Sequence, residues 1–250
     1  MNEEENVSIN ARALTLISHK LKTPLSIING YSEAILSQAG KEKFSPFTSK
    51  ALEEINKQGG KMSQLVDKLL AFNKVITAQH EGMEKQSVLL KPLIKECAAK
   101  AITLEEELAL PVSPQEDGSV KRGTFVEIDC PERLSVTANE EMLRLCVQEL
   151  LANAIKFNNK MEKIIKVQCA NHGDSISLSV RDYGAGIRPQ DVNRIFEPFY
   201  QVDDFFTGQI SGWGLGLAMV KRILDLHNGS ISVVSDRGLG SIFTINFPVL

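Results

Sequence analysis

The sequence contains no long apolar run, and none of its segments approaches the roughly 18 consecutive apolar residues that a membrane-spanning helix requires. No signal peptide is visible, and neither a basic run nor the net charge of −3 indicates nucleic-acid binding. Cysteine is scarce, and no CxxC pair indicates a zinc site or a redox dithiol among Cys97, Cys130, Cys146 and Cys169. These absences leave an ordinary globular protein that carries its thiols free.

Two helical patterns occupy the first third of the chain. Apolar residues recur at steps of three and four at Leu14, Ile17, Leu21, Pro24, Ile28, Tyr31 and Ile35. After a break marked by Gly40 and Pro46, a second pattern runs through Ile55, Met62, Leu65, Leu69, Phe72 and Ile76. The patterns predict a helical hairpin with one apolar face. That face would pair with a second copy in a dimeric four-helix bundle, or would pack on the rest of its own chain.

His19 lies two residues past Ile17, so helical rotation turns it away from the apolar seam. Thr23 follows one turn later on nearly the same face, and Pro24 removes a backbone hydrogen bond and is expected to bend the helix. On its own, this position is as compatible with an ordinary exposed histidine as with a nucleophile.

From about residue 86 the pattern becomes mixed. Residues 87–108 read as a strand and then a helix. Further helices are expected at 139–158, with Asn139 as N-cap, and at 215–228. Strands are expected at 124–130, 163–170, 175–184, 231–236 and 241–249. Because strands and helices do not alternate regularly, we predict the α+β class, an α/β sandwich whose mixed sheet is covered on one face by helices.

Two features of this second region suit a nucleotide. In "QELLANAIKFN", Glu149, Asn153 and Lys156 share one helix face, where oxygen ligands could hold a magnesium ion and an ammonium could meet phosphate. In "DYGAGI", Asp182 ends an apolar strand and could accept a hydrogen bond from an adenine amine, with glycines following that allow close backbone approach. Taken singly, the first also fits a solvated helix face and the second a tight turn.

Two further features follow in order. "IFEPFYQVDD" is an aromatic and proline cluster that leads into a polar loop. "GWGLGLAMVKRI" is a glycine-rich loop that opens an apolar helix, where backbone N–H groups and the helix N-terminus would face an anion.

The four features together, downstream of "SHKLKTPL", resemble the cytoplasmic core of sensor histidine kinases over nearly the whole chain. "SHKLKTPL" is similar to the H box of that family, "ELLANAIKF" to the N box, "DYGAGI" and "GWGLGL" to the two glycine boxes, and "FEPFY" to the F box. The resemblance implies a dimerisation and histidine-phosphotransfer hairpin over residues 1–82. It implies an ATP-binding domain of the Bergerat fold over residues 83–250.

By this resemblance His19 would receive the γ-phosphate of ATP and pass it to an aspartate of a response-regulator receiver domain. Asp182 would hold the adenine amine, Asn153 would bind Mg²⁺, and Lys156 would meet the phosphates. The nucleotide site would also include Gly184, Gly186, Ile187, Phe196, Gly212, Gly214, Leu215, Gly216 and Leu217. Residues 199–213 would form its lid. The expected location is cytoplasmic, as a short soluble kinase or as the cytoplasmic part of a longer or membrane-anchored sensor.

The chain departs from the family pattern at three places. Lys20 stands where an acid commonly follows the histidine and helps to remove its proton, and no Asp or Glu lies between Arg12 and Ser32. Glu149 stands where asparagine is common, and could supply the missing base or bind magnesium. The predicted lid contains no Lys or Arg, and Trp213 replaces a small hydroxyl residue.

These departures leave alternatives to an active kinase. With Thr23 present to orient an attacking water, the protein could act mainly as a response-regulator phosphatase. It could also be a nucleotide-sensing module that transfers no phosphate. The sequence specifies neither the signal, nor the response regulator, nor whether phosphate moves within or between subunits.

Overall fold

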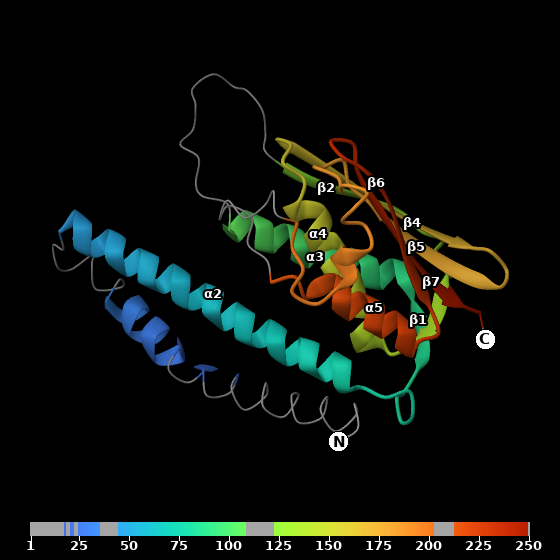
Figure 1. Cartoon of the computed structure of the whole chain (residues 1–250), viewed down its shortest axis with the longest axis horizontal. Helices are drawn as coiled ribbons and strands as arrows, with labels where there is room; N and C mark the ends of the chain where they lie inside the picture. The colour runs from blue at the N-terminus through green and yellow to red at the C-terminus, as the bar shows by residue number, and fades with distance from the viewer. Residues whose placement is uncertain are drawn as a thin grey trace. The chain divides into compact units, whose positions relative to one another are not determined.

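The structure is a computed structural model that describes residues 18, 21–22, 25–35, 45–108, 123–202 and 213–249 (Figure 1). It divides into two compact units, residues 1–77 and residues 78–250. Within the described parts of the chain, no helix combines the length and apolar character needed to cross a membrane. The α+β class predicted from the sequence is confirmed, since a helical unit is followed by a unit with a mixed sheet.

The first unit is a pair of helices, residues 25–35 and α2 (Pro46–Thr77), that lie side by side (Figure 1). Small and polar residues line their contact. The Ser32 hydroxyl donates to the Leu52 carbonyl at 3.1 Å, and the Asn29 amide donates to the Ser63 hydroxyl at 3.4 Å. A β-carbon at Gly59 would overlap the Asn29 side chain, so glycine allows the helices to approach closely there.

The apolar seam predicted from the sequence is largely exposed. Its exposed members are Leu21, Ile28, Tyr31, Ile35, Ile55 and Met62. A row of large apolar side chains in water is unfavourable, at about 25 cal/mol per Å² of apolar surface. The side of the hairpin that carries this row therefore has the character of an interface.

The second unit contains two sheets. A small antiparallel pair joins β1 (Gln86–Leu89) to β3 (Ser135–Ala138). The five-stranded sheet has the order β2-β4-β5-β7-β6 and is antiparallel except between β2 and β4. Its strands are β2 (Gly123–Asp129), β4 (Glu162–Asn171), β5 (Ser175–Arg181), β6 (Ser230–Asp236) and β7 (Gly240–Pro248). β3 was not predicted from the sequence.

Three helices cover one face of this sheet, α3 (Leu90–Leu108), α4 (Glu140–Lys156) and α5 (Gly216–Leu226) (Figure 1). Alternate residues of the central strands point into this core, as the two-residue period of a strand requires. They include Ile165, Val167, Ile176, Leu178, Val180, Phe243, Ile245 and Phe247, all of which are buried. The buried apolar residues of α4 and α5 pack against these strand residues. The polar residues at the ends of the two helices lie outside this core.

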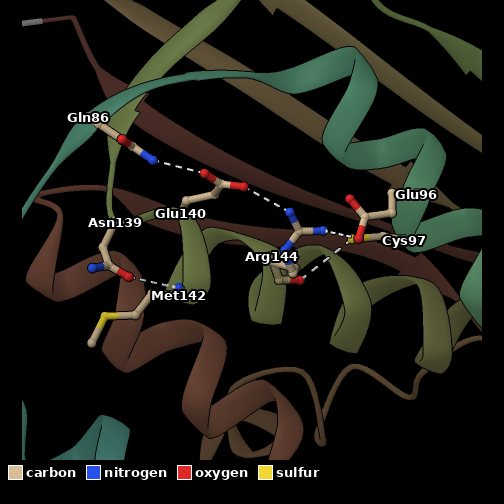
Figure 2. Close-up of polar contacts among 7 residues, drawn as sticks. All are labelled: Gln86, Glu96, Cys97, Asn139, Glu140, Met142 and Arg144. Atoms are coloured by element: carbon tan, nitrogen blue, oxygen red, sulfur yellow. Dashed lines mark hydrogen bonds and ion pairs between the residues drawn. The ribbon is translucent and has the colours of Figure 1, made fainter.

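The amino end of α4 is held by polar contacts (Figure 2). The Asn139 side chain accepts from the Met142 N–H at 3.1 Å, which confirms the predicted N-cap. Arg144 forms ion pairs with Glu96 of α3 at 2.7 Å and with Glu140 at 2.9 Å. Glu140 in turn accepts from the Gln86 side chain at 2.9 Å. These bonds fix α4 against α3 and β1.

His227 joins the same end of α4 to the end of α5. The side chain is 4% exposed, its Nδ1 is 2.7 Å from the Ile223 carbonyl, and its Nε2 accepts from the Asn139 N–H at 3.0 Å. The Phe247 ring meets it edge-on. Only the neutral ring with its proton on Nδ1 satisfies both bonds, because a carbonyl needs a donor and an N–H needs an acceptor.

Acid is therefore expected to destabilise the second unit through His227. Burial lowers its pKa below the ordinary 6.5, and the nearby Lys85 and His80 act in the same direction. A depressed histidine pKa means that the unfolded chain binds the proton better, so stability falls as the pH drops below about 6.5. Thermal melts of the wild type between about pH 7.5 and 5.5 should show a steeper loss of Tm than those of His227→Asn. Parallel pH profiles would contradict this assignment.

Candidate functional site

Most of the residues predicted to bind a nucleotide lie in the second unit. His19, Lys20, Thr23 and Gly212 lie outside the described residues, as does most of the predicted lid. The remaining predicted residues lie at the carboxyl end of α4, in the loop after β5 and at the amino end of α5, except Phe196, which ends the short 3₁₀ helix η1 (Arg194–Phe196).

α4 presents a polar face near its end. Glu149, Asn153 and Lys156 are each half-buried on this helix, spaced four and three residues apart. The Lys156 ammonium lies 4.5 Å from the centre of the Phe157 ring, a favourable cation–π distance. The helix therefore places a carboxylate, an amide and an ammonium along one line.

Asp182 follows directly after β5 and is 5% exposed. Its Oδ1 accepts from the Gly184 N–H at 2.8 Å, and its own N–H donates to the Ser241 carbonyl at 2.9 Å. Burial raises the pKa of this carboxyl above its usual value, and the hydrogen bond from Gly184 opposes the shift. Burial of a carboxylate lowers the stability of the fold unless hydrogen bonds or a bound ligand compensate for the lost water. Asp182 is therefore a strong candidate for a ligand contact.

The glycines after Asp182 are required by their contacts. A β-carbon at Gly184 would overlap the carbonyl oxygen of Phe157, and the next residue, Ala185, donates its N–H to that same oxygen at 3.1 Å. Gly186 has φ +66° and would overlap the Asp236 carbonyl oxygen if it carried a β-carbon. The loop is thereby pressed between the end of α4 and the end of β6.

The turn between β6 and β7 forms the other side of this loop. The Ile187 N–H donates to the Ser235 hydroxyl at 2.8 Å, and that hydroxyl donates to the Gly240 carbonyl at 2.9 Å. The Gly238 N–H donates to the Ala185 carbonyl at 2.7 Å. Nothing in the local sequence of "DYGAGI" indicates these partners, which lie about 50 positions later in the chain.

α5 begins at Gly216, beside Glu149. A β-carbon at Gly216 would overlap Oε2 of Glu149, so the carboxylate lies directly against the start of the helix. The partial positive charge of a helix amino end favours an anion there. Leu215 is fully buried. Ile187, Phe196 and Leu217 are partly exposed.

This arrangement fits a nucleoside triphosphate with Mg²⁺. A buried carboxylate beside a glycine loop suits an amino-substituted base, and a lysine with a helix amino end suits phosphates. Among the residues that the structure describes, no group of three acidic, histidine or cysteine side chains could hold a metal alone. Mg²⁺ usually takes one or two protein oxygens together with substrate phosphates, and Glu149 and Asn153 match that pattern.

The sequence reasoning missed the polar contacts that support the site. Asp191 is 3% exposed and is bonded to both Arg188 and Tyr200. Ser235 links the loop after β5 to the β6–β7 turn. An aspartate within "IRPQDVNRIFEPFY" carries no periodic or motif signal of burial, and the bonds involve residues brought together only by the fold.

Comparison with protein families finds two matches. Residues 10–77 match the "His Kinase A (phospho-acceptor) domain". Residues 138–250 match the "Histidine kinase-, DNA gyrase B-, and HSP90-like ATPase". The second range contains α4, the loop after β5 and α5, and so includes every described element of the candidate site.

Similar curated proteins include sensor proteins and sensor histidine kinases. The phosphate regulon sensor protein PhoR of Pseudomonas aeruginosa is 30% identical over 92% of this chain and 48% of its own length. The sensor histidine kinase YkoH of Bacillus subtilis is 34% identical over 92% of this chain and 46% of its own length. The chain thus spans about half the length of these relatives.

Solved structures share the fold. Full-length ShkA, crystallised in complex with AMPPNP, has a TM-score of 0.70 and 24% identity, covering 95% of this chain and 45% of that one. The mycobacterial sensor histidine kinase MprB has a TM-score of 0.52 and 21% identity, covering 66% of this chain and 97% of that one. With its phospho-acceptor and ATPase domains in this order, the chain belongs to the sensor histidine kinase family.

Proposed function

We propose that this chain is the kinase core of a two-component system, with residues 1–82 as the dimerisation and phosphotransfer hairpin and residues 83–250 as the catalytic domain. One observation carries the proposal. The loop that starts at the buried Asp182 packs directly on the end of α4, the helix that holds Glu149, Asn153 and Lys156. The groups proposed to bind the base and the phosphates therefore lie side by side.

In the proposed reaction, a nitrogen of the neutral His19 imidazole attacks the γ-phosphorus of ATP. The new N–P bond forms as the bond between the γ-phosphorus and the β–γ bridging oxygen breaks, ADP leaves, and a base takes the imidazole proton. Neutral imidazole is the major form near pH 7, because the ordinary histidine pKa is about 6.5.

Within the site, Asp182 orients the adenine through its exocyclic amine, and Gly184 and Gly186 allow the backbone to approach the base. Lys156 and the amino end of α5 face the phosphates. Asn153 would hold Mg²⁺, which would neutralise charge on the β- and γ-phosphates. Gly212, Gly214, Leu215 and Gly216 would contribute backbone to the same end, with Ile187, Phe196 and Leu217 lining it.

Glu149 is the proposed base. Lys20 cannot accept a proton while it is charged, so it would instead attract the γ-phosphate. Glu149 is a carboxylate at the phosphate end of the site, beside Gly216. It would take the proton when the catalytic domain docks on His19.

The partners follow from the two units. The exposed apolar row that includes Ile28, Tyr31, Ile55 and Met62 supports pairing of the hairpin with a second copy. Phosphate would then pass from His19 to an aspartate of a response-regulator receiver domain, with Thr23 in position to assist the reverse, hydrolytic reaction.

The test is autophosphorylation with radiolabelled ATP and Mg²⁺. The wild type is expected to form an acid-labile, alkali-stable phosphoprotein, and His19→Ala is expected to incorporate no label above background. His80→Ala is the matched control, because His80 is exposed and lies outside the candidate site. No label on the wild type, or label that survives His19→Ala, would reject the autokinase.

A further inference from the structure

Asp191 is a buried carboxylate that the proposed chemistry does not use. Its Oδ1 accepts from the Tyr200 hydroxyl at 2.7 Å, and its Oδ2 accepts from Nε of Arg188 at 2.6 Å. Its carbonyl also accepts the N–H groups of Arg194 at 2.9 Å and Ile195 at 3.0 Å, at the start of the short 3₁₀ helix η1 (Arg194–Phe196). Both the carboxylate and the backbone carbonyl of Asp191 therefore accept two hydrogen bonds each.

Tyr200 is held on its ring as well as on its hydroxyl. The Arg194 guanidinium lies 4.2 Å from the ring centre, and the Tyr200 N–H donates to the Glu197 carbonyl at 3.3 Å. The hydrogen bond from Tyr200, followed by that from Arg188, lowers the pKa of Asp191, so its carboxylate is charged at neutral pH. A charged acceptor makes the bond from Tyr200 a strong one.

The residue before Tyr200 meets a distant part of the chain. The Phe199 N–H donates to the Gly214 carbonyl at 2.8 Å, although 15 positions separate the two residues. Phe199 has φ +64° and Gly214 has φ +65°, and a β-carbon at Gly214 would overlap the backbone of Phe199 and Tyr200. A non-glycine residue keeps a left-handed backbone only where its surroundings enforce it.

The contacts continue into the candidate site. Gly214 is followed by the buried Leu215 and by Gly216, the first residue of α5, which lies against Glu149. A continuous series of contacts therefore runs from the Asp191 carboxylate through Tyr200 and Gly214 to the phosphate end of the site.

We propose that Asp191 is a positioning residue for the triphosphate, acting through Tyr200 to fix the Gly214–Gly216 backbone beside Glu149. This inference rests on the proposed nucleotide-binding function. It predicts that the contact between Asp191 and Tyr200 matters for the phosphate end of the ligand and not for the adenine end, since Asp182 and its glycines are held by other partners.

The experiment compares two ligands on the full chain. AMPPNP with Mg²⁺ reports on the whole site, and adenosine, followed by NMR titration, reports on the base pocket. Tyr200→Phe and Asp191→Asn are each expected to lower AMPPNP affinity about tenfold, as for loss of a hydrogen bond to a charged group. Adenosine affinity should change less than about twofold, because the base pocket keeps its contacts. KM for ATP in autophosphorylation should rise in parallel, with kcat changed much less.

Controls separate positioning from general destabilisation. Asp225→Asn removes an exposed carboxylate from α5 and should leave both affinities unchanged. The double variant Tyr200→Phe/Asp191→Asn should lose clearly less than the sum of the two single losses, because both changes weaken the same contact. Equal losses for AMPPNP and adenosine, or additive losses in the double variant, would overturn the positioning role.

The result also distinguishes this inference from the proposed function. A wild type that binds AMPPNP and labels His19, with Tyr200→Phe equally active, overturns the inference alone. A wild type that does not bind AMPPNP overturns both.

Discussion

Glu149→Gln is expected to slow labelling of His19 by about 100-fold or more, while AMPPNP affinity stays within about threefold of the wild type. Glutamine keeps the size of the side chain and an oxygen ligand, but it cannot accept a proton. The position of Glu149 against Gly216, at the end of the site proposed to bind phosphate, is the reason for the expectation. The measurement is single-turnover labelling at saturating ATP, with binding followed by calorimetry.

Two further variants make the result decisive. Glu141→Gln changes an exposed glutamate two turns earlier on α4 and should leave the labelling rate unchanged. Lys20→Glu places an acid next to His19 and should restore part of the rate lost in Glu149→Gln. Loss of AMPPNP binding in Glu149→Gln would instead assign Glu149 to Mg²⁺, and an unchanged rate would exclude it as the base.

Gly184→Ala is expected to weaken AMPPNP binding by about 100-fold, the scale on which small misplacements of a site act. The added methyl group would overlap the Phe157 carbonyl oxygen, which belongs to the backbone and cannot rotate out of the way as a flexible side chain can. The loop after β5 must therefore move away from α4, which also breaks the bond between Ala185 and Phe157. Overpacking of this kind should cost about 1–3 kcal/mol of stability.

Gly60→Ala is the matched control for Gly184→Ala. Gly60 lies within α2 with nothing within 4 Å of an added β-carbon, so the same methyl group meets open space. There the change should stabilise the helix by about 0.5–1 kcal/mol and leave nucleotide binding unaltered. Thermal melts and calorimetry on both variants provide the check. A Gly184→Ala protein that binds AMPPNP normally would show that the close packing of this loop is not required.

The sequence was sufficient to predict the elements with strong periodic signals. The helix over 139–158, its Asn139 cap and the strands around residues 163–184 are confirmed, because their apolar spacing and capping chemistry are local properties. The site could be outlined from motif order, since the resemblance to a family carries information that single residues do not. The assignments of individual site residues remain predictions.

What could not be predicted depends on contacts between distant segments. Glu149 was identified as an acid on a helix face, but its contact with Gly216 requires α4 and α5 to be packed together. Asp191 and Ser235 carry no local signal, and their bonding partners are set by loops whose paths the fold determines. In the sequence, His227 was simply the end of a predicted helix. In the structure its ring makes hydrogen bonds both to α5 and to Asn139 at the start of α4.

The turn between β6 and β7 has a consequence for how this protein can vary. Exposed hairpin turns usually tolerate inserted or exchanged residues. Here the turn is joined to the loop after β5 by hydrogen bonds from the Gly238 N–H to the Ala185 carbonyl and from the Ile187 N–H to the Ser235 hydroxyl. The Asp236 carbonyl oxygen also lies where it would overlap a β-carbon on Gly186. Changes in the length of the turn would be passed directly to the loop after Asp182. Substitutions in the two segments are therefore expected to depend on one another. Substitutions that compensate for defects in residues 182–187 should arise in residues 235–240.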